Sequence, residues 1–155
     1  MDLPCFVPSC ALRQVRVPFV RTNADVHEIP LPTLLSHFLA VILSARTTGV
    51  VTQAALEAVT SMLERGLFRS TSAGLTRAVQ EIAHATSHCR FEPSDAGRDE
   101  VVLLSILDVM AALVCGYARN EDGSKGTPLV DQLGDESVCE MMETCLSMCC
   151  QTVSY

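Results

Sequence analysis

Histidines and cysteines are the side chains that could hold a metal ion in this chain of 155 residues. His84 and His88 are four residues apart, Cys89 follows directly, and Glu81 lies about one helical turn earlier. This spacing would place two imidazoles on one helix face, as zinc sites use. A third and fourth ligand at matching spacing are missing, and no C-x-x-C pair occurs. The pattern therefore favours solvated or helix-capping histidines over a metal site.

The cysteines resemble core residues more than a disulfide framework. They are Cys5, Cys10, Cys89, Cys115, Cys139, Cys145, Cys149 and Cys150. Residues 1–10 lack the basic region and apolar run of a signal peptide, and four cysteines crowd into one helical pattern near the end. We expect reduced thiols that serve as small core residues. Cys145 and Cys149 share a helix face near several methionines, where a Met/Cys core stripe is favoured over a soft-metal site.

The sequence has no catalytic motif. It lacks the G-x-S-x-G nucleophile elbow, and Gly123 and Gly126 lie in a polar segment without the lysine and helix of a phosphate-binding loop. We therefore expect neither enzymatic activity nor a cofactor.

Composition predicts one helical domain. Hydrophobic residues make up 48% of the chain and aromatic residues only 5%, so the core must be built from aliphatic side chains. The net charge of −7 argues against binding to nucleic acid, which requires a basic surface. The longest apolar run, residues 109–115, is far too short to span a membrane.

Residues 1–30 carry four prolines and show no helical period, which predicts an irregular N-terminal arm before a helical domain over 31–155. The first helix should run from Pro32 to about residue 44. A turn follows in which Gly49 can take a positive φ, and Thr52 should cap the second helix, which Gly66 ends.

Three more helices are expected. One begins after a cap at Ser70, Thr71 or Ser72 and ends near residue 88. Another is capped by Asp95 or Asp99 and is apolar around almost its whole circumference, so it should be central and buried. A mobile surface loop over about 117–134 should precede a last helix capped by Asp135. The fold class is all-α, an α-solenoid or irregular bundle of about five or more helices.

Candidate interface residues lie on the last two of these helices. The simplest role for Glu100 is a favourable interaction with the positive end of a helix dipole. The alternative is that Glu100 supplies a charge at an interface. The last helix carries Met141, Met142 and Leu146, whose apolar surface should be partly exposed at one end of the domain.

Four segments, in order over about residues 31–150, resemble the N-terminal dimerisation and cyclophilin-binding (DCB) domain of large Arf guanine-nucleotide exchange factors. They are F-L-A-V-I-L-S-A-R-T-T-G-V-V-T-Q-A-A-L at 38–56, A-H-A-T-S-H-C-R-F at 83–91, D-E-V-V-L-L at 99–104, and E-S-V-C-E-M-M at 136–142. The last two resemble the GBF/Gea branch in particular. Residues 1–30 do not resemble the family, and the segment at 118–130 looks like an insertion.

The resemblance implies an armadillo-like helical fold and a non-catalytic regulatory role. It implies a homodimer, contact with a downstream homology-upstream (HUS) domain, and contact with Arf- or Rab-family small GTPases. It places the parent protein in the cytoplasm, peripherally at Golgi membranes in vesicle traffic, with the catalytic exchange domain outside this chain. The alternative is a free-standing helical adaptor that binds a partner helix in a groove.

Overall fold

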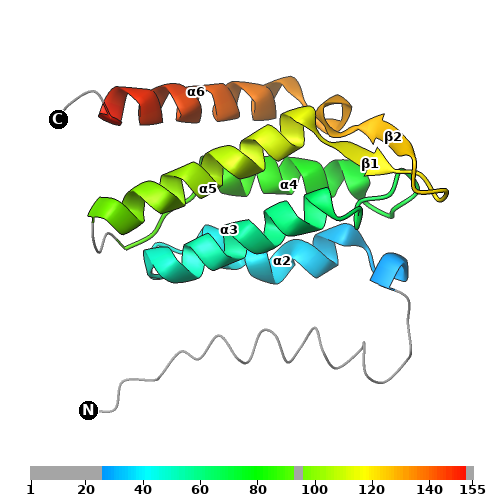
Figure 1. Ribbon diagram of the computed structural model, residues 1–155, viewed down its shortest axis with the longest axis horizontal. Coiled ribbons are helices and arrows are strands. Elements are labelled where there is room, and N and C mark those ends of the chain that lie inside the picture. The colour runs from blue at the N-terminus through cyan, green and yellow to red at the C-terminus, as the bar shows by residue number, and fades with distance from the viewer. Residues whose placement is uncertain (1–25, 93–95, 153–155) are drawn as a thin grey trace, which may run out of the picture.

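The computed structural model describes residues 26–92 and 96–152, and within these ranges the fold is all-α with one small hairpin (Figure 1). The helices are α2 (Leu31–Ile42), α3 (Gly49–Glu64), α4 (Leu75–Ser87), α5 (Ala96–Cys115) and α6 (Asp135–Thr152). Short 3-10 helices, η1 (Val26–Glu28) and η2 (Leu129–Gln132), precede α2 and α6. Of the expected irregular arm, residues 1–25 lie outside the described residues, and η1 occupies part of the rest.

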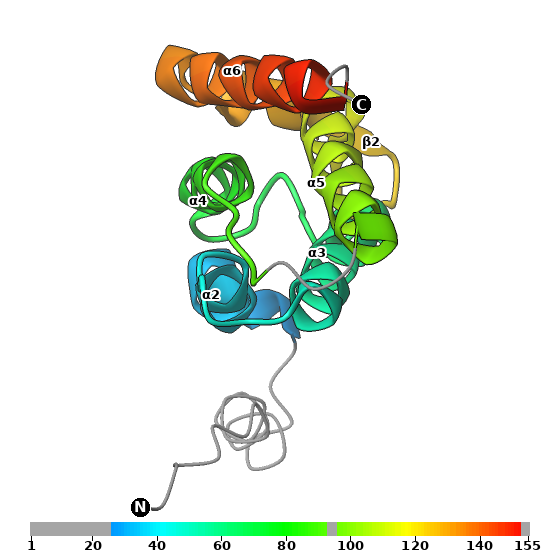
Figure 2. The ribbon, with the colours of Figure 1, turned by 90° about the vertical axis from the view of Figure 1, so that its left-hand side faces the viewer.

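The helices are stacked in two layers (Figure 2). Along one layer α2 packs on α4 and α4 on α6, while α3 packs on α5 in the other. The backbone N–H of Leu31 donates to the carbonyl of Ala73 at 3.2 Å, and that of Arg90 donates to the carbonyl of Ile42 at 3.3 Å. These bonds join α2 and α4 at both ends, so the two helices run in the same direction. Successive helices that alternate between two layers are typical of an α-solenoid.

Aliphatic side chains form the core, as the composition predicts. Fully buried members come from all the larger helices but α6, and α6 adds Met141. They include Leu35, Ile42, Leu56, Val59, Val79, Ile82, Val102, Ile106, Val109 and Leu113, with Phe68 between α3 and α4.

The start of α3 differs from the prediction. The helix begins at Gly49, so Thr52 lies inside it and is not its cap. The Thr52 hydroxyl is buried, and its Oγ1 lies 3.0 Å from the Oγ1 of Thr47 in the preceding turn. Gly49 does not have a positive φ. A Cβ there would lie 3.3 Å from Cγ2 of Val102, so the close approach of α3 to α5 is what favours glycine.

The remaining helix ends agree in part. Gly66 follows α3 with φ of 78°, which confirms it as the residue that ends this helix. Gly74, with φ of 75°, precedes α4, so none of the residues 70–72 caps this helix. The Ser72 hydroxyl instead accepts the N–H of Arg69 at 3.1 Å within the turn.

The acidic residues expected to cap the last two helices lie elsewhere in their first turns. Asp135 is the first residue of α6 and not its cap. In this position its carboxylate still interacts favourably with the positive end of the helix dipole. Asp99 lies within the first turn of α5, and Asp95 is outside the described residues.

Helix α5 is not buried on all sides. Val102, Val109 and Leu113 are fully buried against the core, but Leu104 is 54% exposed and Leu107 37% exposed. The reason is that α5 contacts α3, α4, η2 and, at one edge, α6, which leaves its outer side open. The apolar circumference of this helix therefore consists of one buried side and one exposed side.

Residues 117–134 form regular structure where a mobile surface loop was predicted. Strand β1 (Tyr117–Arg119) pairs antiparallel with β2 (Lys125–Pro128), and η2 follows. The N–H of Arg119 donates to the carbonyl of Phe68 at 2.7 Å, and the N–H of Ser70 donates to the carbonyl of Arg119 at 2.9 Å. Ala118 and Leu129 are fully buried and anchor the segment. Its mobility stays a prediction.

Candidate interaction surfaces

The outer side of α6 carries large exposed apolar side chains. Met142 is 61% exposed and Leu146 64% exposed, and Val138 is exposed one turn before Met142. Spacings of four residues place these side chains on one face of the helix. Within the described residues, α6 packs on α4 and only at its edge on α5, because no helix of the second layer covers it.

Exposed residues of α5 border this face. The Sγ of Cys145 lies 3.5 Å from the Sδ of Met110, so the two helices touch in the C-terminal half of α5. Leu107 and Val114 lie three residues before and four residues after Met110, which places them on the same side of the helix. Both are exposed. We call Leu107, Val114, Val138, Met142 and Leu146 the α5–α6 face.

The structure distributes the predicted interface residues unevenly. It brings Met142 and Leu146 together on the α5–α6 face, and Glu100 lies exposed near the start of α5. Met141 is only 5% exposed and belongs to the core, so it offers no docking surface. Leu107 and Val114 were missed because a helix apolar all round was expected to be buried. Which side of α5 is covered, as at Leu113, and which side is left open depends on packing that the sequence does not show.

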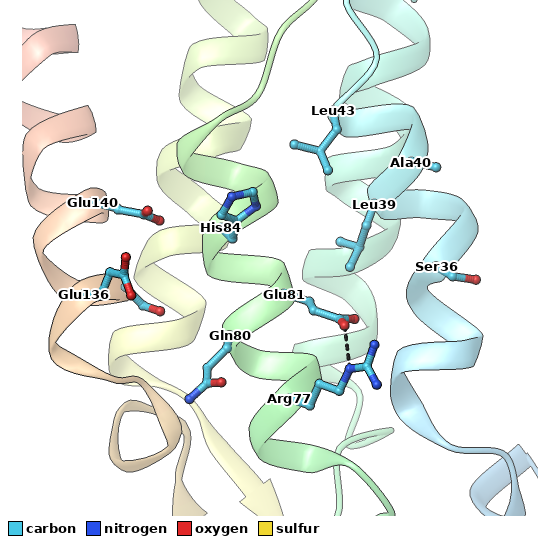
Figure 3. A pocket seen from close by; sticks show the side chains of 11 residues that line it. Ser36, Leu39, Ala40, Leu43, Arg77, Gln80, Glu81, His84, Glu136 and Glu140 are labelled. Carbon is cyan, nitrogen blue, oxygen red and sulfur yellow. Dashed lines mark hydrogen bonds and ion pairs between the residues drawn. The ribbon is translucent and has the colours of Figure 1, made fainter.

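A second surface is a groove of about 640 Å³ between α2, α4 and α6 (Figure 3). Leu39 and Ala40 of α2, with Leu43 just after its end, form an apolar wall. Arg77, Gln80, Glu81 and His84 come from α4, and Glu136 and Glu140 from α6. Arg77 Nε donates to Glu81 Oε1 at 2.7 Å. The lining contains three glutamates and one arginine, and we call this feature the acidic groove.

The histidine pair is engaged within α4 and with α6. The rings of His84 and His88 stack with centroids 4.3 Å apart, and His88 Nδ1 lies 3.0 Å from the carbonyl oxygen of His84. His88 Nδ1 is 4.0 Å from Glu140 Oε2, while Glu81 pairs with Arg77. In residues 26–92 and 96–152, no group of three or more His, Cys, Asp or Glu side chains is placed to hold a metal ion.

The thiols are less buried than predicted. No disulfide joins the six cysteines in the described part of the chain, and Cys5 and Cys10 lie outside it. Cys115, Cys139, Cys149 and Cys150 are exposed, so they are not core residues. Cys89 is partly buried beside Phe91 and Met148, and burial raises the pKa of its thiol to about 11.

None of the helices within the described ranges is long and apolar enough to cross a membrane. No family model matches the chain. Curated relatives nevertheless align with most of it. It is 37% identical to an uncharacterized protein of Schizosaccharomyces pombe over 119 residues. These residues are 77% of this chain and 7% of that protein.

Two named relatives indicate a class. The chain is 37% identical to the Golgi-specific brefeldin A-resistance guanine nucleotide exchange factor 1 homolog of Caenorhabditis elegans, over 79% of this chain and 6% of that protein. It is 33% identical to an ARF guanine-nucleotide exchange factor of Arabidopsis thaliana, over 93% of this chain and 9% of that protein. The chain is thus similar to a short segment of proteins named as Arf guanine-nucleotide exchange factors, in agreement with the motif resemblance at that level. It spans less than a tenth of their length.

Proposed function

We propose that this chain is a non-catalytic regulatory domain of a large Arf guanine-nucleotide exchange factor, equivalent to the DCB domain of the GBF/Gea type, and that it acts by dimerisation and docking. The observation that carries the proposal is the α5–α6 face. Large exposed apolar patches on folded domains usually mark interaction sites. The similarity to segments of Arf exchange factors supports the assignment of the parent protein.

The simplest partner for the face is a second copy of the chain. In a two-fold dimer the same patch meets itself, so one set of apolar residues supplies both halves of the interface. Leu107, Met142 and Leu146 would lie near its centre, where burial contributes most of the affinity. The downstream HUS domain and Arf- or Rab-family small GTPases are the further partners that the family resemblance proposes. On this proposal the domain reaches Golgi membranes only as part of the cytoplasmic parent protein.

A second candidate function is that of an adaptor that binds a helix of a partner protein. Here α2 is covered by α3 from the second layer, and α4 contacts α5, but no described helix covers α6 in the same way. An amphipathic helix from another protein would complete this layer, with its apolar residues on Met142 and Leu146.

Light scattering across a dilution series separates these functions. We expect the wild-type chain to change from dimer to monomer in the micromolar range. Met142→Glu and Leu146→Glu should each weaken the dimer at least tenfold, because a carboxylate would be buried at the interface. Val50→Glu is the matched control, since Val50 is a large apolar residue on α3 that is also about half exposed, and it should leave the dimer unchanged.

A wild-type chain that stays monomeric at high concentration would remove the dimer and favour the adaptor. Open-ended aggregation would contradict both, because neither function predicts it. Incubation with Arf and labelled nucleotide tests the non-catalytic assignment, for which we expect no acceleration of nucleotide release.

A further inference from the structure

The acidic groove combines two kinds of recognition. One wall is apolar, with Leu39 from α2 and Leu43 just after its end, and the opposite side carries the carboxylates of Glu136 and Glu140 from α6 (Figure 3). The floor is α4, where Glu81 is already paired with Arg77. Its volume of about 640 Å³ is enough for several side chains. A ligand that matches this lining would carry both cationic and apolar side chains.

The chain itself contains a segment of this chemistry. Residues 11–21, A-L-R-Q-V-R-V-P-F-V-R, carry three arginines and no acidic residue, although the chain as a whole has a net charge of −7. Leu12, Val15 and Phe19 supply apolar side chains beside the arginines. We call residues 11–21 the basic segment. It lies outside the described residues, so its position is inferred from charge and reach alone.

The connection between the two is short. The basic segment is separated from η1 by residues 22–25, and η1 leads directly into α2, which forms the apolar wall. Five extended residues from Arg21 to Val26 reach about 17 Å. The groove begins at Ser36, which is five residues, or roughly 7.5 Å of helix, from the start of α2. The tether can therefore bring Arg21 to the near end of the groove, and Arg13 and Arg16, which lie eight and five residues further from η1, can extend across α4 towards α6.

We propose that the acidic groove is the intramolecular docking site of the basic segment, with arginines on Glu136 and Glu140 and apolar side chains on Leu39 and Leu43. A single exposed ion pair contributes little, but a tethered segment binds at a high effective concentration. Several pairs beside an apolar wall can then keep the groove occupied. The proposal is independent of the α5–α6 face, which lies on the other side of α6.

Amide hydrogen exchange on the full-length chain at low ionic strength tests the docking. We expect exchange of residues 11–21 to be slowed at least tenfold relative to an unstructured peptide of the same sequence, and to lose this protection at high salt. The double substitution Glu136→Arg and Glu140→Arg should restore exchange to within twofold of the peptide. A matched double reversal at Glu57 and Glu64, two exposed glutamates of α3, should leave the protection intact.

A charge swap keeps the test informative. Adding Arg13→Glu and Arg16→Glu to the groove double variant should recover most of the protection, whereas an unfolded groove variant would not recover. Unprotected residues 11–21 in the wild-type chain would overturn the proposal. Equal effects of the groove and α3 reversals would also overturn it, since they would indicate general charge attraction. Protection that falls on dilution would assign the segment to the groove of a second copy instead.

Discussion

At the scale of single residues, the environment of Cys89 sets its reactivity. Its thiol lies at the junction of α4, α5 and α6, and desolvation raises its pKa to about 11. The thiolate is the reactive form, so a raised pKa lowers the fraction available for alkylation near neutral pH. The described chain thus contains thiols of different reactivity despite their shared chemistry.

We expect iodoacetamide at pH 8 to modify Cys89 at least tenfold more slowly than Cys115, which is exposed at the end of α5. Peptide mass spectrometry over time measures both rates in one sample. Because the fold favours the neutral thiol, this contribution to stability is complete below the ordinary thiol pKa. It is lost as pH rises from there towards about 11. Equal rates for the two cysteines in the folded chain would contradict the burial of Cys89.

The sequence predicted the structural roles of some residues and not of others. Gly66 does end α3, because a helix stop depends on local backbone conformation. Gly49 and Thr52 were assigned to a turn and a cap, but α3 starts earlier. The role of Gly49 depends on α5, whose Val102 approaches it within the same layer, whereas the buried Thr52 hydroxyl contacts Thr47 in the preceding turn. A contact between residues about fifty positions apart cannot be inferred from local patterns.

At the scale of elements, α5 has two sides of very different energetic weight. Leu113→Ala should cost about 2–5 kcal/mol, because Leu113 is fully buried and its loss leaves a cavity. Leu104→Ala should change stability by about 0.5 kcal/mol or less, because Leu104 is more than half exposed. Chemical denaturation with both variants in parallel measures the difference. Similar losses for the two would place α5 at the centre of a bundle, as its sequence alone suggested.

The β1–β2 hairpin should also be cleaved unevenly. Arg119 is joined to Phe68 and Ser70 by backbone hydrogen bonds, whereas Lys125 is exposed beside the turn at Gly123. Limited trypsin digestion should therefore cut after Lys125 before it cuts after Arg119. The fragments can be ordered by intact-mass measurement over time. Earlier cleavage at Arg119 would mean that the strand opens more readily than its contacts indicate.

Long periodic elements could be predicted and short ones could not. The five large helices were expected within a few residues of their observed bounds, because each carries several turns of apolar spacing. β1 and β2 are three and four residues long, too short to show an alternating pattern. The candidate faces were located only in part, because exposure on α5 and α6 depends on which neighbour each helix has.

At the scale of the whole molecule, the layered arrangement determines which faces remain open. α4 has α2 on one side and α6 on the other, while α6 has a described neighbour on one side only. The α5–α6 face and the acidic groove follow from this geometry, because α6 borders both. Composition could predict an all-α domain, but neither surface could be located before the order of the helices within the layers was known.

The end position of α6 has a consequence for unfolding. In a stacked array each helix is stabilised mainly by its nearest neighbours, so the array need not open all at once. α6 can detach from α4 while α2, α3 and α5 keep their shared core around Leu56 and Val102. Amides of α6 should then exchange through a partial opening of lower free energy than those of α3, which denaturant-dependent exchange would resolve. A partner bound to α6 would suppress this partial opening. Binding there would therefore be detected as slower amide exchange in α6 alone.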